Sequence, residues 1–227
     1  MSFQDLGARL AEVGDRVAAA VARGGHGQRV TIIAVTKTHG PDAVHAAWNA
    51  GVQNVGENKV QEALGKMGSV NVPVRWHLIG HLQRNKVREL DHFALVHSID
   101  RPSIADAVSA FGLARKRSVD ALVQVNVVGE QSKGGFAPED IPAEAEQFIR
   151  RAGLRLSGVM AMAPLNADER TTRQVFQGAR AARELLVSAG HPAFDLSMGM
   201  SNDYELAVEE GATMIRLGTV LFGERGT

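Results

Sequence analysis

A lysine follows an apolar stretch in the first fifth of the chain. Lys37 comes two residues after the run Thr31–Val35, which consists of Thr, Ile, Ile, Ala and Val. A lysine amine that ends a strand and faces a partly desolvated pocket is a nucleophile for carbonyl carbons. Position alone favours an ordinary surface lysine at the start of a loop, so a second feature is needed before this residue indicates chemistry.

Two loops rich in Gly, Ser and Thr near the C-terminus supply that feature. Ser201 follows the seventh expected strand, and Gly218 and Thr219 follow the eighth. Barrel proteins often bind a phosphate with the N–H groups of these last loops, although ordinary turns use the same residues. Ser201 is expected either to cap the next helix or to donate to a phosphate. Together with Lys37, the loops describe one ligand, a phosphate-bearing aldehyde.

An arginine lies within the last of these motifs. Arg216 precedes Gly218 by two residues, and in a barrel strand its side chain would point inward, toward the ligand. A guanidinium can only donate hydrogen bonds, so opposite a pyridine nitrogen it keeps that nitrogen unprotonated and weakens the ring as an electron sink. The alternative is an ion pair with Glu57 or Asp195 inside the barrel.

The elements that must position these residues follow a repeated pattern of helix, glycine and short apolar strand. The glycines are Gly51, Gly153, Gly190 and Gly211, and a glycine just past a helix takes the left-handed conformation at little cost. Eight strands are expected, near 30–36, 53–56, 74–79, 94–98, 119–127, 155–161, 194–198 and 213–217. Helices are expected near 41–50, 58–67, 82–91, 101–115, 138–151, 168–189 and 202–210.

Eight strand–helix units predict a single (β/α)8 TIM barrel of the α/β class, and a doubly wound sheet is the alternative because sequence alone does not show closure. An extra N-terminal helix precedes the barrel. Its apolar residues recur at helical spacing from Phe3 to Val21, and Gly24 and Gly25 end it. With no linker or break in composition, residues 1–227 are expected to form one domain.

The composition excludes several kinds of protein. The chain has 25 basic and 25 acidic residues and no cysteine. A formal net charge of zero offers no electrostatic surface for nucleic acid or anionic lipid. The absence of cysteine excludes disulfides, thiolate metal sites and cysteine nucleophiles. The sequence contains no run of about 20 apolar residues, the length that a membrane-spanning helix needs, and no secretory signal is visible. A cytoplasmic protein is therefore expected.

Five segments at strand ends resemble one known family, in order and over essentially the whole chain. They are 34–38 (AVTKT), 56–62 (GENKVQE), 76–86 (WHLIGHLQRNK), 197–203 (SMGMSND) and 215–219 (IRLGT). The chain is similar to the pyridoxal phosphate homeostasis proteins. This resemblance implies a barrel like the N-terminal domain of bacterial alanine racemase, with pyridoxal 5′-phosphate (PLP) as cofactor and Lys37 as the lysine that carries it.

The resemblance also implies the other cofactor-binding residues. Ser201, Gly218 and Thr219 would hold the phosphate, Arg216 would face the ring nitrogen, and Asn58 and His77 would line the pocket. Members of the family have no established turnover and hold the cofactor and hand it over. The expected partners are therefore PLP and PLP-dependent apo-enzymes, with the chain as a monomer or weak dimer and with no catalytic residue or metal ligand.

Enzymes remain the competing class. A PLP-dependent racemase needs a second acid–base group opposite the lysine, and Tyr204, the one tyrosine of the chain, lies in the helix expected after the seventh strand. A Schiff-base aldolase would need no arginine at a ring nitrogen. A metal hydrolase could use His77 and His81, which are four residues apart, but Gly80 lies between them at a strand end, where helical spacing does not bring them to one face.

Overall fold

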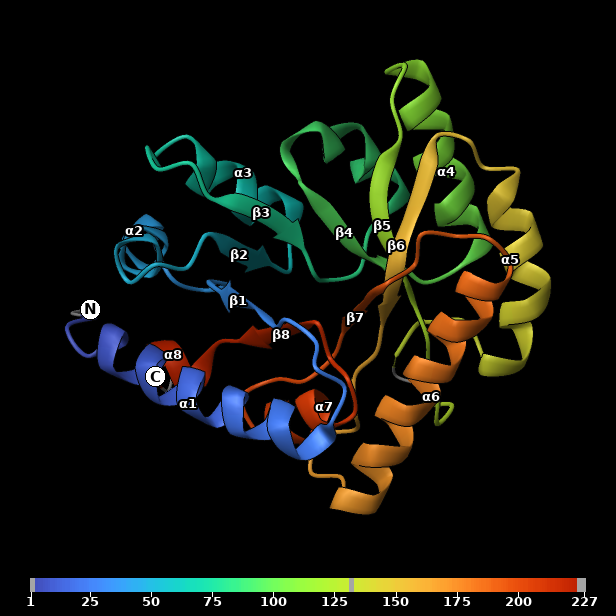
Figure 1. Cartoon of the computed structure of the whole chain (residues 1–227). Helices are drawn as coiled ribbons and strands as arrows, with labels where there is room; N and C mark the ends of the chain where they lie inside the picture. The colour runs from blue at the N-terminus through green and yellow to red at the C-terminus, as the bar shows by residue number, and fades with distance from the viewer. Residues whose placement is uncertain (1–2, 131–132, 224–227) are drawn as a thin grey trace.

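The structure is a computed structural model that describes residues 3–130 and 133–223. Eight parallel strands follow one another in chain order around a closed barrel, and helices surround them (Figure 1). The strands are β1 (Thr31–Val35), β2 (Asn54–Glu57), β3 (Arg75–Leu78), β4 (Leu95–Ile99), β5 (Val119–Gln124), β6 (Leu154–Met160), β7 (Asp195–Ser197) and β8 (Met214–Leu217).

The helices alternate with the strands after one N-terminal helix. The α-helices are α1 (Leu6–Gly24), α2 (Pro41–Asn49), α3 (Val60–Met67), α4 (Pro102–Ala114), α5 (Ile141–Ile149), α6 (Glu169–Ser188), α7 (Tyr204–Glu209) and α8 (Thr219–Phe222). Two further helices, η1 (Arg84–His92) and η2 (Pro138–Asp140), are of the 3₁₀ type.

The expected barrel is confirmed, and the doubly wound alternative is wrong. Strand β1 pairs with β8 in register from Thr31 opposite Met214 to Ala34 opposite Leu217, so the sheet has no free edge. The helix expected at 82–91 is the 3₁₀ helix η1, and the short helix α8 after the last strand was not expected.

Three of the four glycine joints have the expected left-handed backbone. The φ angles of Gly51, Gly190 and Gly211 are 93°, 93° and 96°. At Gly153 the expectation is wrong, because its φ is not positive. A Cβ there would lie 2.0 Å from the carbonyl oxygen of Ser109 in α4, so close packing of the backbone explains this glycine.

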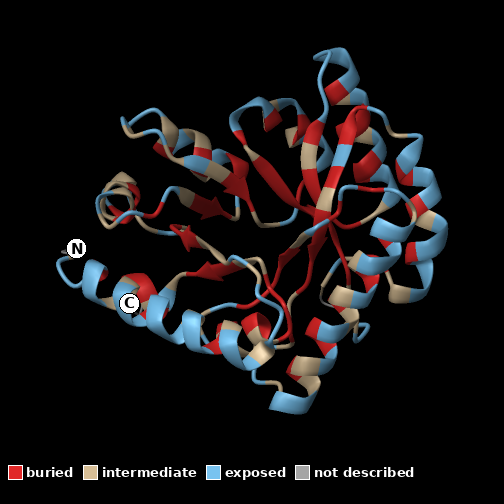
Figure 2. Cartoon of the chain, in the orientation of Figure 1, coloured by how far each residue is buried: buried red, intermediate tan, exposed pale blue. Residues whose placement is uncertain are grey.

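The apolar core has two layers separated by the strands, and Figure 2 shows that most residues of the strands are buried. The larger layer lies between the sheet and the helices and includes Ala34, Val55 and Leu217. Inside the barrel, a small cluster around Leu95 and Leu122 fills one part of the interior. Since side chains alternate along a strand, each strand contributes to both layers, and polar side chains occupy the rest of the interior.

Helix α1 packs across the C-terminal end of the chain, against α7 and α8. Its buried side includes Leu6, Val13 and Ala20, and the half-exposed Arg16 and Arg23 form ion pairs with Glu205 and Glu209 of α7. This helix is therefore part of the domain and does not present a free apolar face. Within residues 3–130 and 133–223, no helix combines the length and apolar character needed to cross a membrane.

Candidate functional site

The residues expected to bind the cofactor gather on the carboxyl side of five strands. They are Lys37 after β1, Asn58 after β2, His77 within β3, Ser201 after β7, Arg216 within β8, and Gly218 and Thr219 after β8. Since parallel strands all run one way, these ends share one mouth of the barrel. The closure of β8 onto β1 brings the lysine loop beside the β8 loop, where Val35 is the nearest neighbour of Gly218.

Lys37 lies in a turn two residues beyond the end of β1, and its side chain is half-buried. Ala34 belongs to the outer core, and the Thr36 hydroxyl donates to Glu57 on the same outer face. Because side chains alternate between the two faces of a strand, Lys37 falls on the inner face. Among the residues that the structure describes, none forms a hydrogen bond or ion pair with the Lys37 amine. The amine is therefore not committed to a structural role within this part of the chain.

A chain of hydrogen bonds crosses the interior of the barrel beneath this mouth. His77 Nε2 lies 3.0 Å from Asn54 Oδ1, and His77 Nδ1 lies 2.9 Å from His97 Nε2. On the far side, His97 Nδ1 lies 2.9 Å from Ser197 Oγ, and Arg216 Nη1 lies 2.7 Å from the same hydroxyl oxygen. Five strands, β2, β3, β4, β7 and β8, thus contribute to one polar network.

The direction of donation in this interior chain follows from its two ends. Arg216 can only donate, so the Ser197 hydroxyl accepts from it and donates its own proton to His97 Nδ1. Each neutral imidazole has one donor and one acceptor, so His97 Nε2–H donates to His77, and His77 Nε2–H donates to the Asn54 oxygen. The Ser197 hydroxyl and both ring N–H groups each meet an acceptor, and the arrangement requires both histidines to be neutral.

Burial favours this neutral form. It lowers the pKa of His77 to about 4, and the nearby charge of Arg75 acts in the same direction. The pKa of His97 is also lowered well below its usual range, first by complete burial and then by His77 and Arg216. Burial lowers the pKa of Arg216 to about 10, which still leaves its guanidinium charged at neutral pH.

Both ring nitrogens of His77 are thus engaged by protein groups. The structure places this predicted residue in the barrel interior and leaves its ring edge, not a free nitrogen, for any contact with a ligand. Asn58 lies half-buried directly after β2, and its backbone packs so closely on Gly80 that a Cβ on Gly80 would lie 2.3 Å from the Asn58 carbonyl oxygen.

The guanidinium of Arg216 is fixed at several points. One terminal nitrogen donates to the carbonyl oxygen and to the hydroxyl of Ser197, both at 2.7 Å, and the other donates to the carbonyl oxygen of Ala161 at 3.1 Å. These three bonds leave two of its five N–H groups without a partner among the described residues. The side chain is 4% exposed and points into the barrel, as expected.

The alternative of an ion pair between Arg216 and Glu57 or Asp195 is wrong. Glu57 faces the outer layer, where it binds Lys66 on α3, and Asp195 accepts a hydrogen bond from Thr213. Alternation along β2 explains the first outcome, because Glu57 and its neighbour Asn58 must face opposite sides of the sheet.

The loops after β7 and β8 meet directly. The Ser201 hydroxyl accepts a hydrogen bond from the backbone N–H of Val220 at 3.2 Å, which leaves its own proton free to donate. The expectation that Ser201 caps the next helix is wrong, because Asp203 is the N-cap residue of α7 and accepts from the Met200 N–H. Ser201 instead joins the loop after β7 to the loop after β8.

Gly218 and Thr219 form the other side of this junction. The carbonyl of Gly218 accepts from Leu221 and Phe222, and Thr219 is the first residue of α8, where the amide has no carbonyl partner within the helix. The backbone of Gly218 has a negative φ, and a Cβ there would make only an ordinary 3.6 Å contact with Val35. Packing within the protein therefore does not require glycine at this position.

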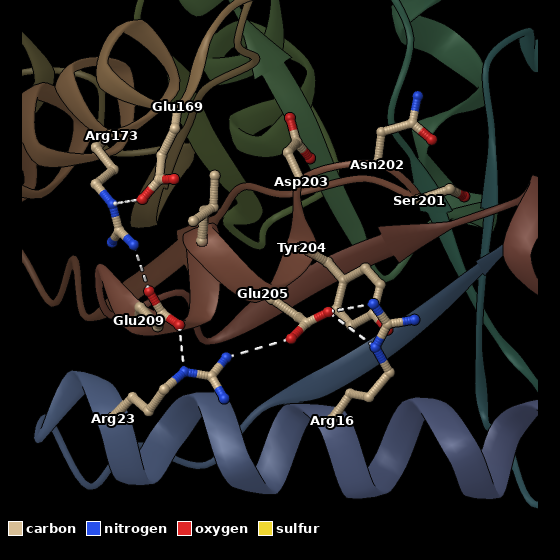
Figure 3. Close-up of a pocket in the computed structure, with 11 residues that line it drawn as sticks. Arg16, Arg23, Glu169, Arg173, Ser201, Asn202, Asp203, Tyr204, Glu205 and Glu209 are labelled. Carbon is tan, nitrogen blue, oxygen red and sulfur yellow. Dashed lines mark hydrogen bonds and ion pairs between the residues drawn. The ribbon is translucent and has the colours of Figure 1, made fainter.

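A pocket of about 380 Å³ lies beside the Ser201 loop, on the outside of the barrel. Figure 3 shows the ion pairs that line it, between α1, α7 and the start of α6. Arg16 pairs with Glu205, and Arg23 and Arg173 both pair with Glu209. Since each of these arginines already has a carboxylate partner, the pocket joins α1 to the barrel and offers no free cation to a ligand.

The remaining sequence candidates lie apart from one another. His81 is mostly exposed and pairs with Asp100, whereas His77 belongs to the interior chain, so the two histidines do not share a site. Among the described residues, no group of three or more His, Asp or Glu side chains is arranged to hold a metal ion. Tyr204 lies in α7 with its hydroxyl buried, and the guanidinium of Arg16 from α1 lies over its ring (Figure 3).

Sequence reasoning missed three members of the interior chain. Asn54 begins β2 and His97 lies in the middle of β4, whereas the sequence candidates lie at or near the carboxyl ends of strands. Ser197 is the last residue of β7 and lies in the segment 197–203, but its sequence position alone assigned it no role. A signal was available, since polar residues at inward positions of predicted barrel strands must find partners with one another. Which of them meet depends on the closed register of five strands, which the sequence does not contain.

Comparisons with known proteins show the family to which the chain belongs. The family model described as "Alanine racemase, N-terminal domain" matches residues 10–226. A pyridoxal phosphate homeostasis protein from Pseudomonas aeruginosa is 44% identical, and the alignment covers 95% of this chain and 94% of that protein.

Solved structures give the same result. The structure of PipY from Synechococcus elongatus has been solved with PLP bound. PipY is 35% identical to this chain, and the two structures align with a TM-score of 0.85 over 96% of this chain and all of PipY. An alanine racemase from Corynebacterium glutamicum, at 14% identity and a TM-score of 0.71, covers 93% of this chain and 61% of the racemase, and it shows likeness of fold alone. By sequence and by structure, the chain belongs to the pyridoxal phosphate homeostasis protein family.

Proposed function

We propose that the chain binds PLP as a Schiff base on Lys37 and holds it for transfer to PLP-dependent apo-enzymes, as a component of vitamin B6 homeostasis. One observation carries this proposal, namely that an uncommitted lysine amine and a rigidly held arginine lie at the same mouth of the barrel. The structure of PipY with PLP bound supports the choice of ligand.

The donor set fits the cofactor at three points. The two N–H groups of Arg216 that lack a protein partner can donate to the pyridine nitrogen, which is an acceptor when unprotonated. The hydroxyls of Ser201 and Thr219 and the amide of Thr219 can donate to phosphate oxygens. At Gly218 the absence of a side chain gives the phosphate access to the backbone, which is a reason for glycine that protein packing does not supply.

When bound, the cofactor supplies an aldehyde and a ring able to withdraw electrons. The residues of this chain favour holding over turnover. Arg216 donates and cannot protonate the ring nitrogen at neutral pH, so it limits electron withdrawal. The racemase alternative needs a second acid–base group at the mouth, and Tyr204 is buried in α7 outside the barrel.

Absorbance spectroscopy tests the assignment of Lys37. The purified protein is expected to show the visible band of a PLP Schiff base, and Lys37→Ala is expected to lose it. Lys59→Ala is the matched control, because Lys59 is an exposed lysine near the same mouth, and it should keep the band. Borohydride reduction and peptide mapping should place the label on Lys37, and a label on another lysine would contradict the assignment.

Two assays separate a carrier from an enzyme. The loaded protein is expected to activate a PLP-dependent apo-enzyme. The rate of this activation is measured beside the rate that the same concentration of free PLP gives. Amino-acid racemisation by the loaded protein is expected to stay at the level of free PLP. Racemisation that disappears in Lys37→Ala would favour the enzyme instead.

A further inference from the structure

A buried cluster of charges lies directly behind the lysine loop, on the outer side of β1 and β2. Lys66 of α3 is its centre, and its amine donates to three acceptors. These are the carbonyl oxygen of Thr36 at 2.7 Å, Glu57 Oε1 at 2.7 Å and Glu62 Oε1 at 2.8 Å. An ammonium group has three protons, so every donor of Lys66 is satisfied and the amine is not available to a cofactor.

The cluster contacts the residue on each side of Lys37. Before the lysine, the carbonyl of Thr36 accepts from Lys66 and its hydroxyl donates to Glu57. After it, the backbone N–H of Thr38 donates to the carboxylate of Glu62. The lysine is thus the middle residue of three, and both of its neighbours are fixed through backbone groups.

The backbone at Thr38 requires such support. Its φ is 67°, a left-handed conformation that is uncommon for any residue other than glycine and costly for a β-branched one. Residues in such conformations persist only where surrounding contacts over-determine them. The His39 N–H closes this turn onto the Thr36 carbonyl at 3.1 Å, and the hydrogen bond from the Thr38 N–H to Glu62 is the side-chain contact that fixes Thr38 itself.

The charges of the cluster are closely coupled. Glu57 is fully buried, and burial raises the pKa of its carboxyl group although Lys66 and Thr36 donate to it. Burial alone would also raise the pKa of Glu62, but the hydrogen bonds from Lys66 and Thr38 outweigh it and lower that pKa. Glu62 is therefore a strong and permanently charged acceptor for the Thr38 amide at neutral pH.

We propose that Glu57, Glu62 and Lys66 are positioning residues for Lys37, which fix the turn of residues 36–38 so that the lysine amine points into the barrel mouth. The ligand in this inference rests on the proposed function. A lysine on an unbraced turn would sample many directions, and holding a reactive group in one geometry is a large part of what makes its bond formation favourable. The cluster acts from the opposite side of the strand, without touching the ligand.

The decisive variant is Glu62→Ala, because Glu62 is partly exposed and its loss leaves Lys66 paired with Glu57. In the protein without PLP, we expect hydrogen exchange at the Thr38 amide to become faster by roughly tenfold or more. In the protein with PLP, we expect the apparent Kd from the Schiff-base absorbance to rise by roughly ten- to a hundredfold. Glu62→Gln keeps an oxygen acceptor for the Thr38 amide and should stay within about threefold of wild type.

Glu144→Ala is the matched control. Glu144 also lies on a helix, is similarly buried, and pairs with the cation of Arg151, but it lies on α5 away from β1. It should lose a comparable amount of thermal stability and leave both the Thr38 exchange rate and the Kd unchanged. Lys66→Met, with Lys66→Arg as its conservative partner, repeats the test from the other side of the ion pair.

The outcomes distinguish this inference from the proposed function. If wild-type protein forms no Schiff base at Lys37, the proposed function fails. The exchange experiment still tests whether Glu62 fixes the turn of residues 36–38. If wild type binds PLP at Lys37 and Glu62→Ala behaves like Glu144→Ala in both measurements, the proposed function stands and the positioning role is wrong.

Discussion

Two buried polar networks support the barrel mouth, and they are built from opposite chemistry. The outer network consists of Glu57, Glu62 and Lys66, which are charged and lie between the sheet and α3. The interior network is the chain from Arg216 through Ser197, His97 and His77 to Asn54, in which only the first member is charged. The outer network contacts Thr36 and Thr38, the two residues that flank Lys37. The interior network contains two residues of the candidate site, His77 and Arg216.

The difference follows from where the two networks lie. Glu62, at the rim of the outer network, keeps 26% of its side chain exposed, so water shares the cost of holding charge there. The interior chain lies among buried side chains, and His97 is fully buried. There the single charge of Arg216 is satisfied by neutral acceptors, and neutral rings extend the chain. The outer network can therefore be broken by removing a charge, and the interior network by adding one.

The largest expected effect comes from removing the central charge of the outer network. Lys66→Met leaves the fully buried Glu57 without its cation, and breaking a buried pair in this way costs about 3–5 kcal/mol of the free energy of unfolding. Denaturant titration of the protein without PLP measures this loss. Arg151→Met is the comparison, because Arg151 also lies between two carboxylates, of which Asp106 is largely exposed.

The smaller cost at Arg151 is expected because its carboxylate partners can regain water. Equal losses in Lys66→Met and Arg151→Met would show that the outer network gains nothing from being buried. A double variant, Lys66→Met with Glu57→Gln, should recover part of the stability, because it removes the unpaired charge.

A smaller effect is expected when acid adds a charge to the interior network. The pKa of His77 is lowered from 6.5 to about 4 by burial, so the unfolded chain takes up a proton at this residue before the folded protein does. The neutral His77 ring makes its full contribution to the free energy of unfolding above pH 6.5. This contribution is lost as the pH falls toward 4, by about 3 kcal/mol in total. Chemical unfolding at a series of pH values measures the slope.

Buried carboxyl groups contribute to the pH dependence of stability with the opposite sign. Burial raises the pKa of Glu57, Asp195 and Asp203, so the folded protein takes up protons at these carboxyl groups before the unfolded chain does. The comparison is therefore made with His77→Gln, which retains a donor and an acceptor but does not titrate. A pH slope that is the same in this variant and in wild type would contradict the neutral interior chain.

The sequence predicted the parts of this architecture that depend on local pattern. Alternation and glycine joints gave the eight strands, and the position of Lys37 after β1 placed it at the mouth. The same alternation would have shown that Glu57 faces outward, away from Arg216, had it been applied to both residues. Opposite charge alone therefore does not identify an ion-pair partner, because Glu57 and Arg216 lie on opposite faces of the sheet.

The rest depended on facts that a single sequence does not carry. Glu62 and Lys66 are four apart, the spacing of an ordinary exposed helix pair, and only the fold shows that Lys66 is buried against the Thr36 carbonyl. His97 and Ser197 are 100 residues apart and meet only when the barrel closes. Long-range partners of this kind are set by strand register across several units, not by local propensity.

The smallest expected effect is a coupling energy, and it tests whether the two networks are separate. Ser197→Ala removes one of the three acceptors of Arg216 and the donor to His97, at a cost of about 1–3 kcal/mol. Combined with His77→Gln, it should be less costly than the sum of the single changes by about 1 kcal/mol, because both changes interrupt one chain. Urea unfolding of the four proteins of this cycle gives the coupling energy.

Combined with Glu62→Ala, the same Ser197→Ala change should be additive within about 0.5 kcal/mol, because the two networks share no residue and no hydrogen bond among the described residues. Coupling of similar size in both cycles would mean that β1 and β8 transmit strain between the networks. Lys37 and Arg216 would then be positioned by one device. Additivity would mean that the two ends of the proposed cofactor site, Lys37 and Arg216, are supported independently, so that a change in one network leaves the position of the other residue intact.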